Sequence, residues 1–382
     1  MATDLLEEPV RPSPDALAVS RSIPEREPEG LSREVTQYGS QPGQRGSRRD
    51  RRYARRYRVR GLVKFVEAVE GSCAFGRVSS CGFALGGDGL VEIKEHEGVC
   101  YPSGSLLQCG SIWVCPVCSA KIRARREVEL ETAAKEWVSR GGSLAMLTFT
   151  LRHNESMTLI EVLNALLGSY RKLRNRQSFE KLRSLLVGSV RALEVTYGAN
   201  GWHPHLHLLL FVAPGATEDA VQDRLPSMIT DWRNLVQQSL GAVPSVERAI
   251  DLLWFGDDAS TAAGYVSKIA KEMTLSDSKS GFDPFALLDV TGVGRDRAVA
   301  RFIEYANTMK GRHAMDWSPG LRDLLGLGEE KSDEEVANDD VDLGDAIVAV
   351  VLGRQWNRFM REGTSQDFLR WWELRLEAVR RE

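Results

Sequence analysis

The sequence predicts an α+β fold built around a central antiparallel sheet. Three observations favour it: an ordinary globular composition of 42% hydrophobic and 27% charged residues, a strand–helix–hairpin–helix–strand–helix order between about 144 and 268, and a glycine-bearing turn inside the hairpin. No stretch approaches the roughly 18 consecutive apolar residues of a membrane helix. We therefore expect a globular chain with no membrane partner.

The first 60 residues are expected to form a disordered basic arm. Residues 1–44 are rich in Pro, Glu, Ser, Arg and Gly, and such a segment buries too little apolar surface to offset its ordering entropy. Between Arg45 and Arg60 nine arginines stand against one aspartate, interleaved with Tyr53 and Tyr57. Such a run is typical of nucleic-acid binding, although a solvated arm without a partner has the same composition.

Residues 61–125 hold all six cysteines and are expected to form a small cysteine module, which opens with a β-like segment at 61–69. The chain begins without a basic run followed by an apolar core, so we expect no secretory signal and a cytoplasmic location. In that reducing compartment the cysteines are thiols or metal ligands, not disulfides.

Three of these cysteines, Cys109, Cys115 and Cys118, have a spacing that favours a structural Zn²⁺ site. The fourth ligand is Cys81 or Cys100. We favour Cys81 because Ser-Cys-Gly at 80–82 resembles Gln-Cys-Gly at 108–110. Reduced thiols buried in a core are the alternative.

The elements after the cysteines follow from hydrophobic periodicity and from glycine signals. They are a helix at 121–140, a strand at 144–151, a helix at 158–186, strands at 188–196 and 205–212, a helix at 217–240, a strand at 249–255, a helix from about 260 and a helix at 295–309. Gly141-Gly142 ends the first helix, and Asn200-Gly201 marks the hairpin turn.

Helix 158–186 is a candidate DNA-backbone contact, because neutralised phosphates supply much of the affinity for DNA. A solvated helix face is the alternative. The basic residues that we expect to touch DNA are Arg171, Lys172, Arg174 and Arg176.

Residues 203–207 read His-Pro-His-Leu-His and are the sharpest local signal. Alternate side chains of a strand share one face, so His205 and His207 present two imidazoles together, while Pro204 is expected to leave His203 at the strand's edge. Glu194, across the hairpin, could complete the group. Carboxylate and imidazole ligands favour Mg²⁺ or Mn²⁺ over a closed zinc site. Histidines hydrogen-bonded at a strand surface are the alternative.

Tyr265 and Lys268 lie three residues apart on one face of a predicted helix. The spacing alone is weak. Beside a metal site, however, a phenol and a lysine are suited to nucleophilic attack on a phosphodiester.

Together these motifs resemble the HUH endonucleases, and within them the rolling-circle replication initiators of actinobacterial-type plasmids. Three segments carry the resemblance: Met-Leu-Thr-Phe-Thr-Leu-Arg-His at 146–153, Gly-Trp-His-Pro-His-Leu-His at 201–207, and the cysteine segment at 109–118. It covers about residues 81–273, with a fainter echo at 317–322.

The resemblance implies a ferredoxin-like palm of five antiparallel strands within an HUH endonuclease domain at 126–325. By it, His205 and His207 bind the metal, Tyr265 is the nucleophile and Lys268 assists it. The implied activity is site-specific nicking and joining of single-stranded or hairpin origin DNA through a 5′-phosphotyrosine. Host helicase and DNA polymerase are the further partners expected of such an initiator.

One position departs from the family pattern. Some relatives carry a glutamate one turn before the tyrosine, where it activates water for the second cleavage. Thr261 stands there in this chain, so Asp257 or Asp258 could substitute.

The C-terminal part is predicted as an acidic linker at 326–345 and a helical tail at 346–382. Between Glu329 and Asp345 nine carboxylates stand against Lys331. Such a block is typical of a solvated linker, although it could also mimic DNA and compete for the basic arm.

Other functions fit parts of the same pattern. A mobilisation relaxase or a single-strand transposase would use the same catalytic residues, but the upstream cysteines favour an initiator. A non-catalytic, zinc-containing DNA-binding repressor would leave Glu194, His205, His207 and Tyr265 unexplained.

Overall fold

The computed structural model describes residues 48–86, 89–256, 282–339 and 345–381. Two expectations lie outside these ranges: disorder of the first 44 residues, and the helix from about 260 that carries Tyr265 and Lys268. Within them, helices combine with antiparallel sheets, which confirms the α+β class. None of the described helices has both the length and the apolar character needed to cross a membrane.

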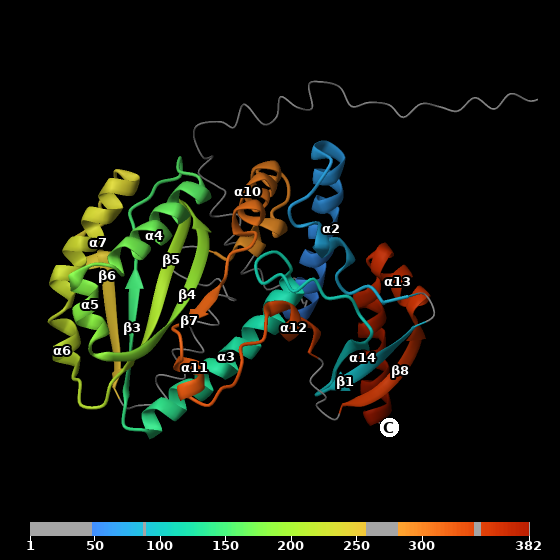
Figure 1. Cartoon of the computed structure of the whole chain (residues 1–382). Coiled ribbons are helices and arrows are strands. Elements are labelled where there is room, and N and C mark those ends of the chain that lie inside the picture. The colour runs from blue at the N-terminus through green and yellow to red at the C-terminus, as the bar shows by residue number, and fades with distance from the viewer. Residues whose placement is uncertain (1–47, 87–88, 257–281, 340–344, 382) are drawn as a thin grey trace, which may run out of the picture.

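A five-stranded sheet forms the larger part of the molecule, and Figure 1 shows it on the left. The strands lie side by side in the order β6-β3-β5-β4-β7, and every neighbouring pair is antiparallel. Their bounds are β3 Ser143–Phe149, β4 Leu186–Gly198, β5 Gly201–Val212, β6 Ile250–Gly256 and β7 Met315–Trp317.

The turn between β4 and β5 requires glycine. Gly201 has a φ of +82°, and a Cβ placed there would lie 2.9 Å from the Cα of Glu155. The predicted hairpin is confirmed, but β5 begins at Gly201 and runs on through Pro204, which pairs with Val195. His203 therefore lies within the strand, and the expectation that Pro204 leaves it at the edge is wrong.

Helices cover the two faces of this sheet, with α4 (Leu159–Leu173) and α7 (Leu225–Leu240) on one and α3 (Pro116–Ser139) on the other. Successive side chains of β5 point to opposite faces of the sheet and so enter two separate hydrophobic cores. Leu206 and Leu208 pack in the core shared with α4 and α7, whereas Leu209 and Phe211 pack with Trp137 of α3.

Two predicted helices are each divided in two. Arg176 takes an extended conformation (φ −90°, ψ 149°) that ends the first and begins α5 (Gln177–Arg183), so Phe179 turns back toward the core. Pro226, in the first turn of α7, separates that helix from α6 (Glu218–Gln222), since proline lacks the N–H that a continuous helix needs. By contrast, α10 (Arg295–Met309) has the predicted bounds.

The arginine run is a helix, not part of a disordered arm. Helix α2 spans Arg48–Glu70, so the β-like segment predicted at 61–69 is also wrong. Val59, Val63 and Val66 recur at helical spacing and are at most 3% exposed. This apolar stripe orders the segment by packing it into the main core.

The C-terminal residues begin with a strand, not a helix. Strand β8 (Ala346–Leu352), rich in β-branched residues, pairs with β1 (Leu90–His96), which pairs with β2 (Val99–Gly104). Helices α13 (Gly353–Glu362) and α14 (Ser365–Arg381) pack on this sheet. Parts of the predicted cysteine module and of the predicted tail thus form one small module, defined as β1, β2, β8, α13 and α14.

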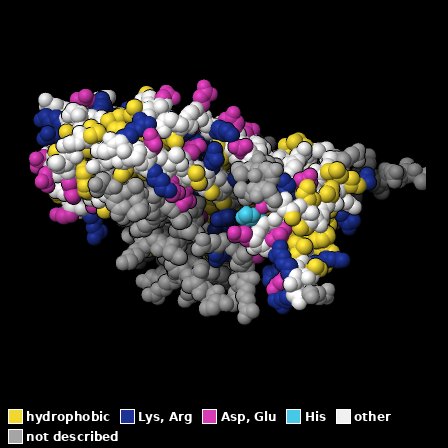
Figure 2. Space-filling model, turned by 90° about the horizontal axis from the view of Figure 1, so that it is seen from below, with side chains coloured by type: hydrophobic (Ala, Val, Ile, Leu, Met, Phe, Trp, Pro, Cys, Tyr) yellow, Lys and Arg dark blue, Asp and Glu magenta, His cyan; other side chains and the backbone are white. Residues whose placement is uncertain are grey.

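The small module lies on the right of Figures 1 and 2. In Figure 2 hydrophobic side chains gather over its surface. Its exposed apolar residues include Leu90, Ile347, Val350 and Trp371.

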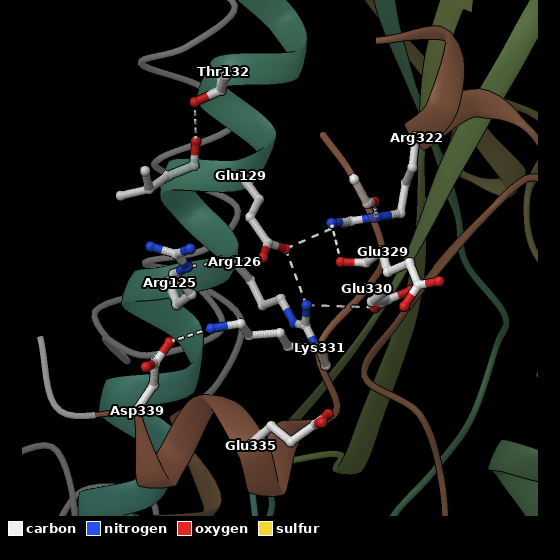
Figure 3. Close-up of polar contacts among 12 residues, drawn as sticks. Arg125, Arg126, Glu129, Thr132, Arg322, Glu329, Glu330, Lys331, Glu335 and Asp339 are labelled. Carbon is white, nitrogen blue, oxygen red and sulfur yellow. Dashed lines mark hydrogen bonds and ion pairs between the residues drawn. The ribbon is translucent and has the colours of Figure 1, made fainter. Parts of the chain in front are cut away.

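The acidic segment was predicted to be a solvated linker. That prediction is wrong, because part of the segment packs against α3 and the main core. Ser332 caps the N-terminus of helix α12 (Asp333–Asn338) with a capping box, and Val336 and Ala337 are buried against the core. Figure 3 shows Arg126 of α3 facing Glu330, at 3.5 Å. Arg126 also lies 3.3 Å from Asp333. These ion pairs, with the buried apolar side, hold the segment on α3.

Candidate metal centre

Glu194, His205 and His207 meet on the face of the sheet that α3 covers. Glu194 of β4 stands directly opposite His205 in the hairpin register, and His207 follows two residues later on the same face. One ligand atom from each lies within 4.8 Å of the others. The structure thus brings together the three residues predicted to hold the catalytic metal.

Hydrogen bonds place the carboxylate between the two rings. Glu194 Oε2 lies 3.0 Å from His207 Nε2 and 3.5 Å from His205 Nδ1. Burial raises the pKa of Glu194, but the hydrogen bonds and charges of both histidines outweigh it and hold this pKa well below its ordinary value. The group therefore offers an ionised oxygen and two imidazole nitrogens, a donor set that suits a divalent cation.

Thr148 of β3 fixes the orientation of one ring. It pairs with His207 across the β3–β5 ladder, and its Oγ1 lies 3.1 Å from His207 Nδ1. Metal-binding histidines commonly hold their second nitrogen in such a bond, which aims the first at the ion. The sequence placed Thr148 in a family motif but gave no sign of this contact.

Two further histidines flank the group. The rings of His153 and His203 meet edge to face at 3.9 Å, and His153 Nδ1 faces the carbonyl oxygen of Asn200 at 3.0 Å. Burial, together with the charges of the neighbouring imidazoles, lowers the pKa of His203 to about 4. Both pKa values are lowered, so neutral rings are favoured there.

A small internal cavity lies behind Glu194, with a volume of ≈ 10 Å³ that suits about one water molecule. Arg123 of α3, Asp283 and Tyr305 line it. Burial lowers the pKa of Arg123 and raises the pKa values of Asp283 and Tyr305. No sequence motif pointed to this polar pocket, because it joins three distant segments.

The predicted DNA-binding residues are not brought to the metal group. They are exposed on the C-terminal turn of α4 and on the turn that follows, and α4 covers the opposite face of the sheet. These residues are Arg171, Lys172, Arg174 and Arg176.

Four cysteines form a second candidate site, at the start of α3. The Sγ of Cys81 lies 3.6 Å from that of Cys115 and 3.5 Å from that of Cys118, and Cys109 Sγ lies 3.7 Å from Cys118 Sγ. All four are buried, and they could hold a metal ion. Cys100 lies apart, in the core of the small module, where burial raises the pKa of its thiol to about 11.

The other predicted catalytic residues cannot be placed, because residues 257–281 lie outside the described ranges. They are Tyr265, Lys268, Thr261, Asp257 and Asp258. Among the described tyrosines, Tyr197 and Tyr305 are 1% and 2% exposed, so neither phenol is accessible to DNA.

The chain is similar to known replication proteins. A family described as "Replication protein" matches residues 108–243, a range that holds Glu194, both histidines and three of the four cysteines. "Protein rep" of Streptomyces lividans is 31% identical over 320 residues, covering 64% of this chain and 70% of that protein. "Neomycin resistance protein" of Streptomyces cyanogenus is 32% identical over 186 residues, 40% of this chain and 42% of that protein. No solved structure matches.

Proposed function

This chain belongs to the plasmid replication initiator (Rep) family, and on that premise we propose that it starts replication by cutting and rejoining one DNA strand. The proposed substrate is single-stranded or hairpin DNA at a plasmid origin, in the cytoplasm. The proposed chemistry is the HUH type, in which a tyrosine becomes linked to the 5′-phosphate of the cut strand.

The observation that carries this proposal is the Glu194–His205–His207 group. Its ligand atoms are mutually close, the carboxylate is ionised, and the His205 side chain keeps 21% of its surface exposed for a substrate to approach. A closed structural site would leave no such approach. Along the chain, α4 lies between β3 and β4, and α7 lies between β5 and β6. This connection, together with the strand order of the large sheet, further supports a ferredoxin-like palm.

A Mg²⁺ or Mn²⁺ ion bound there would neutralise charge on the scissile phosphate oxygens and orient them for in-line attack. The Tyr265 oxygen then forms a bond to phosphorus as the bond from phosphorus to the 3′-oxygen breaks, and the proton lost by the phenol passes through solvent to the leaving 3′-oxygen. Lys268 stabilises the developing negative charge. The 3′-oxygen leaves as a hydroxyl that primes synthesis, so DNA polymerase and a helicase are the proposed partners.

Rejoining reverses the same exchange. A 3′-hydroxyl attacks the phosphotyrosine, the Tyr265 oxygen leaves, and no nucleotide triphosphate is consumed. Because Thr261 replaces a glutamate found in some relatives, Asp257 or Asp258 is the proposed base for a terminating cleavage. Arg171, Lys172, Arg174 and Arg176 would contact DNA away from the cut, since α4 covers the other face of the sheet.

We also propose that Cys81, Cys109, Cys115 and Cys118 bind one structural Zn²⁺. Four buried sulfurs within reach of one point are the donor set of a closed tetrahedral zinc site. Such a site stabilises the fold without taking part in the chemistry.

The decisive experiment is to incubate the full chain with single-stranded origin DNA and Mn²⁺ and to look for a covalent adduct by denaturing electrophoresis. We expect an adduct with the wild type, none with Tyr265→Phe, and none after EDTA until Mn²⁺ is restored. Binding of origin DNA by Tyr265→Phe is the control for folding. An adduct at wild-type level with Tyr265→Phe, or one indifferent to EDTA, would refute the mechanism.

A repressor would bind origin DNA with neither adduct nor metal requirement. A relaxase or transposase would form the adduct on a different DNA, so competition between origin and unrelated single strands separates these functions.

A further inference from the structure

Two arginines of α2 are buried beside the four cysteines. Arg56 is 3% exposed and Arg60 is 7% exposed. Arg60 Nη2 donates a hydrogen bond to the carbonyl oxygen of Cys81, and a Cβ added to Gly82 would lie 2.5 Å from Arg56 Nη1. Both guanidinium groups therefore pack directly on the segment that presents the Cys81 sulfur.

Neither guanidinium has a carboxylate partner within the ranges that the structure describes. Arg56 contacts the Met360 sulfur at 3.9 Å and the ring of Tyr53, while Arg60 contacts two carbonyl oxygens and the ring of Phe83. Other arginines of the same helix do have such partners: Arg55 and Arg58 pair with Asp289, and Arg49 pairs with Glu373. A buried and unpaired charge is strongly unfavourable, so Arg56 and Arg60 need a negative group close by.

The negative groups that they face are the cysteine sulfurs. Both guanidinium groups lie against residues 81 and 82, next to the Cys81 sulfur. The charge of Arg56 is favoured by Cys81, Tyr53, Cys115 and Cys118, and that of Arg60 by Cys81, Cys115 and Cys109, while the two arginines repel each other. A divalent ion on four thiolates carries a net charge of 2 − 4 = −2, and two guanidinium groups bring the sum to zero. Four neutral thiols would leave both arginine charges uncompensated.

We propose that Arg56 and Arg60 are the counter-charges of a tetrathiolate zinc centre and that they fasten α2 and the small module onto it. The inference rests on the zinc site proposed above. Met360 of α13 contacts both guanidinium groups, so the same arginines link the centre to the small module. They are positioning residues, because they act on the metal through the charge and orientation of its ligands.

The test measures zinc retained by the full chain after dialysis against increasing EDTA. Loss of such outer partners commonly weakens metal affinity about 10- to 100-fold, so Arg56→Gln and Arg60→Gln should release zinc at correspondingly lower EDTA. Arg58→Gln is the matched control, because it removes an ion pair from the same helix away from the sulfurs. Arg56→Lys, which keeps the charge, should retain zinc better than Arg56→Gln.

A thermal melt separates a counter-charge from a packing role. If the arginines balance charge, Arg56→Gln should lower the melting temperature of the zinc-loaded chain but not that of the EDTA-stripped chain. A packing role would lower both, and would overturn the proposal. Equal zinc retention in Arg56→Gln, Arg60→Gln and Arg58→Gln would overturn it as well.

Failure of the zinc site itself has a different signature. A wild-type chain purified without zinc, and unable to take it up, would refute the site proposed above together with its counter-charges. Wild-type zinc content with unchanged retention in the two variants would refute the counter-charges alone.

Discussion

The hydroxyl of Thr148 decides which nitrogen of His207 faces Glu194. Because Oγ1 holds Nδ1 at 3.1 Å, Nε2 points at the carboxylate 3.0 Å away. Without that bond the ring can rotate or change tautomer, and the ligand set loses its preorganised geometry.

We therefore expect Thr148→Val to weaken Mn²⁺ binding about 10- to 100-fold, and Thr148→Ser, which restores a hydroxyl, to recover most of the loss. Titration calorimetry with Mn²⁺ measures this directly. Thr150→Val is the control, since the Thr150 hydroxyl bonds the carbonyl oxygen of Arg248 instead. Equal affinity in Thr148→Val and wild type would show that the ring is held by other contacts.

Residues of the metal group could be found from sequence because they depend on short-range rules. Alternation along one strand pairs His205 with His207, and a hairpin turn at Asn200-Gly201 brings Glu194 opposite. The contact between Thr148 and His207 depends on the register between two strands about 60 residues apart in the sequence, and no local pattern encodes that register. Arg56 is hidden for another reason: in sequence its charge suggests a solvent-exposed or DNA-binding residue, and only the packing shows it buried.

Helix α2 differs from its prediction more than any other described element does. The nine arginines between residues 45 and 60 suggested disorder, and the β-branched valines within 61–69 suggested a strand. The spacing of Val59, Val63 and Val66, however, is that of one face of a helix. Local composition was outweighed by burial against the main core, where Val59 and Val63 are 0% exposed.

If α2 is part of the folded core, Val63→Ala should lower the free energy of unfolding by about 2 kcal/mol, because it removes buried methyl groups and leaves a cavity. Urea denaturation followed by circular dichroism measures the change. Val69→Ala on the same helix, where the side chain is 54% exposed, should change stability by less than about 0.5 kcal/mol. A similarly small change in unfolding free energy for both variants would mean that α2 is only loosely attached to the core.

On the scale of the whole molecule, the small module is joined to the cysteine cluster through Trp356. Its ring is 0% exposed, and Nε1 donates to the carbonyl oxygen of Gly82 at 2.9 Å, next to Cys81. The linker-and-tail prediction failed here because pairing of β1 with β8 spans most of the chain, and long-range pairing leaves no local sequence signal.

Trp356→Ala should consequently cost about 3–5 kcal/mol in the free energy of unfolding and also lower zinc retention. Trp371→Ala, a tryptophan of the same module that is 49% exposed, should do neither. Denaturant titration and zinc analysis of the same samples give both readings. Lost stability with unchanged zinc retention would mean that the module and the metal site are independent.

The pairing of β1 with β8 also sets an order of events during translation. His96 ends β1 and Ala346 begins β8, so 346 − 96 = 250 residues separate them. At about 5–20 residues per second, β1 emerges roughly 12 to 50 s before its partner exists. The large sheet, whose last strand ends at Trp317, can close within that interval, whereas β1 keeps one unpaired edge until β8 has been synthesised. A ribosome that stalls between Trp317 and Ala346 would leave a nascent chain with a completed large sheet and an unpaired strand edge on β1, a substrate for chaperones and proteases.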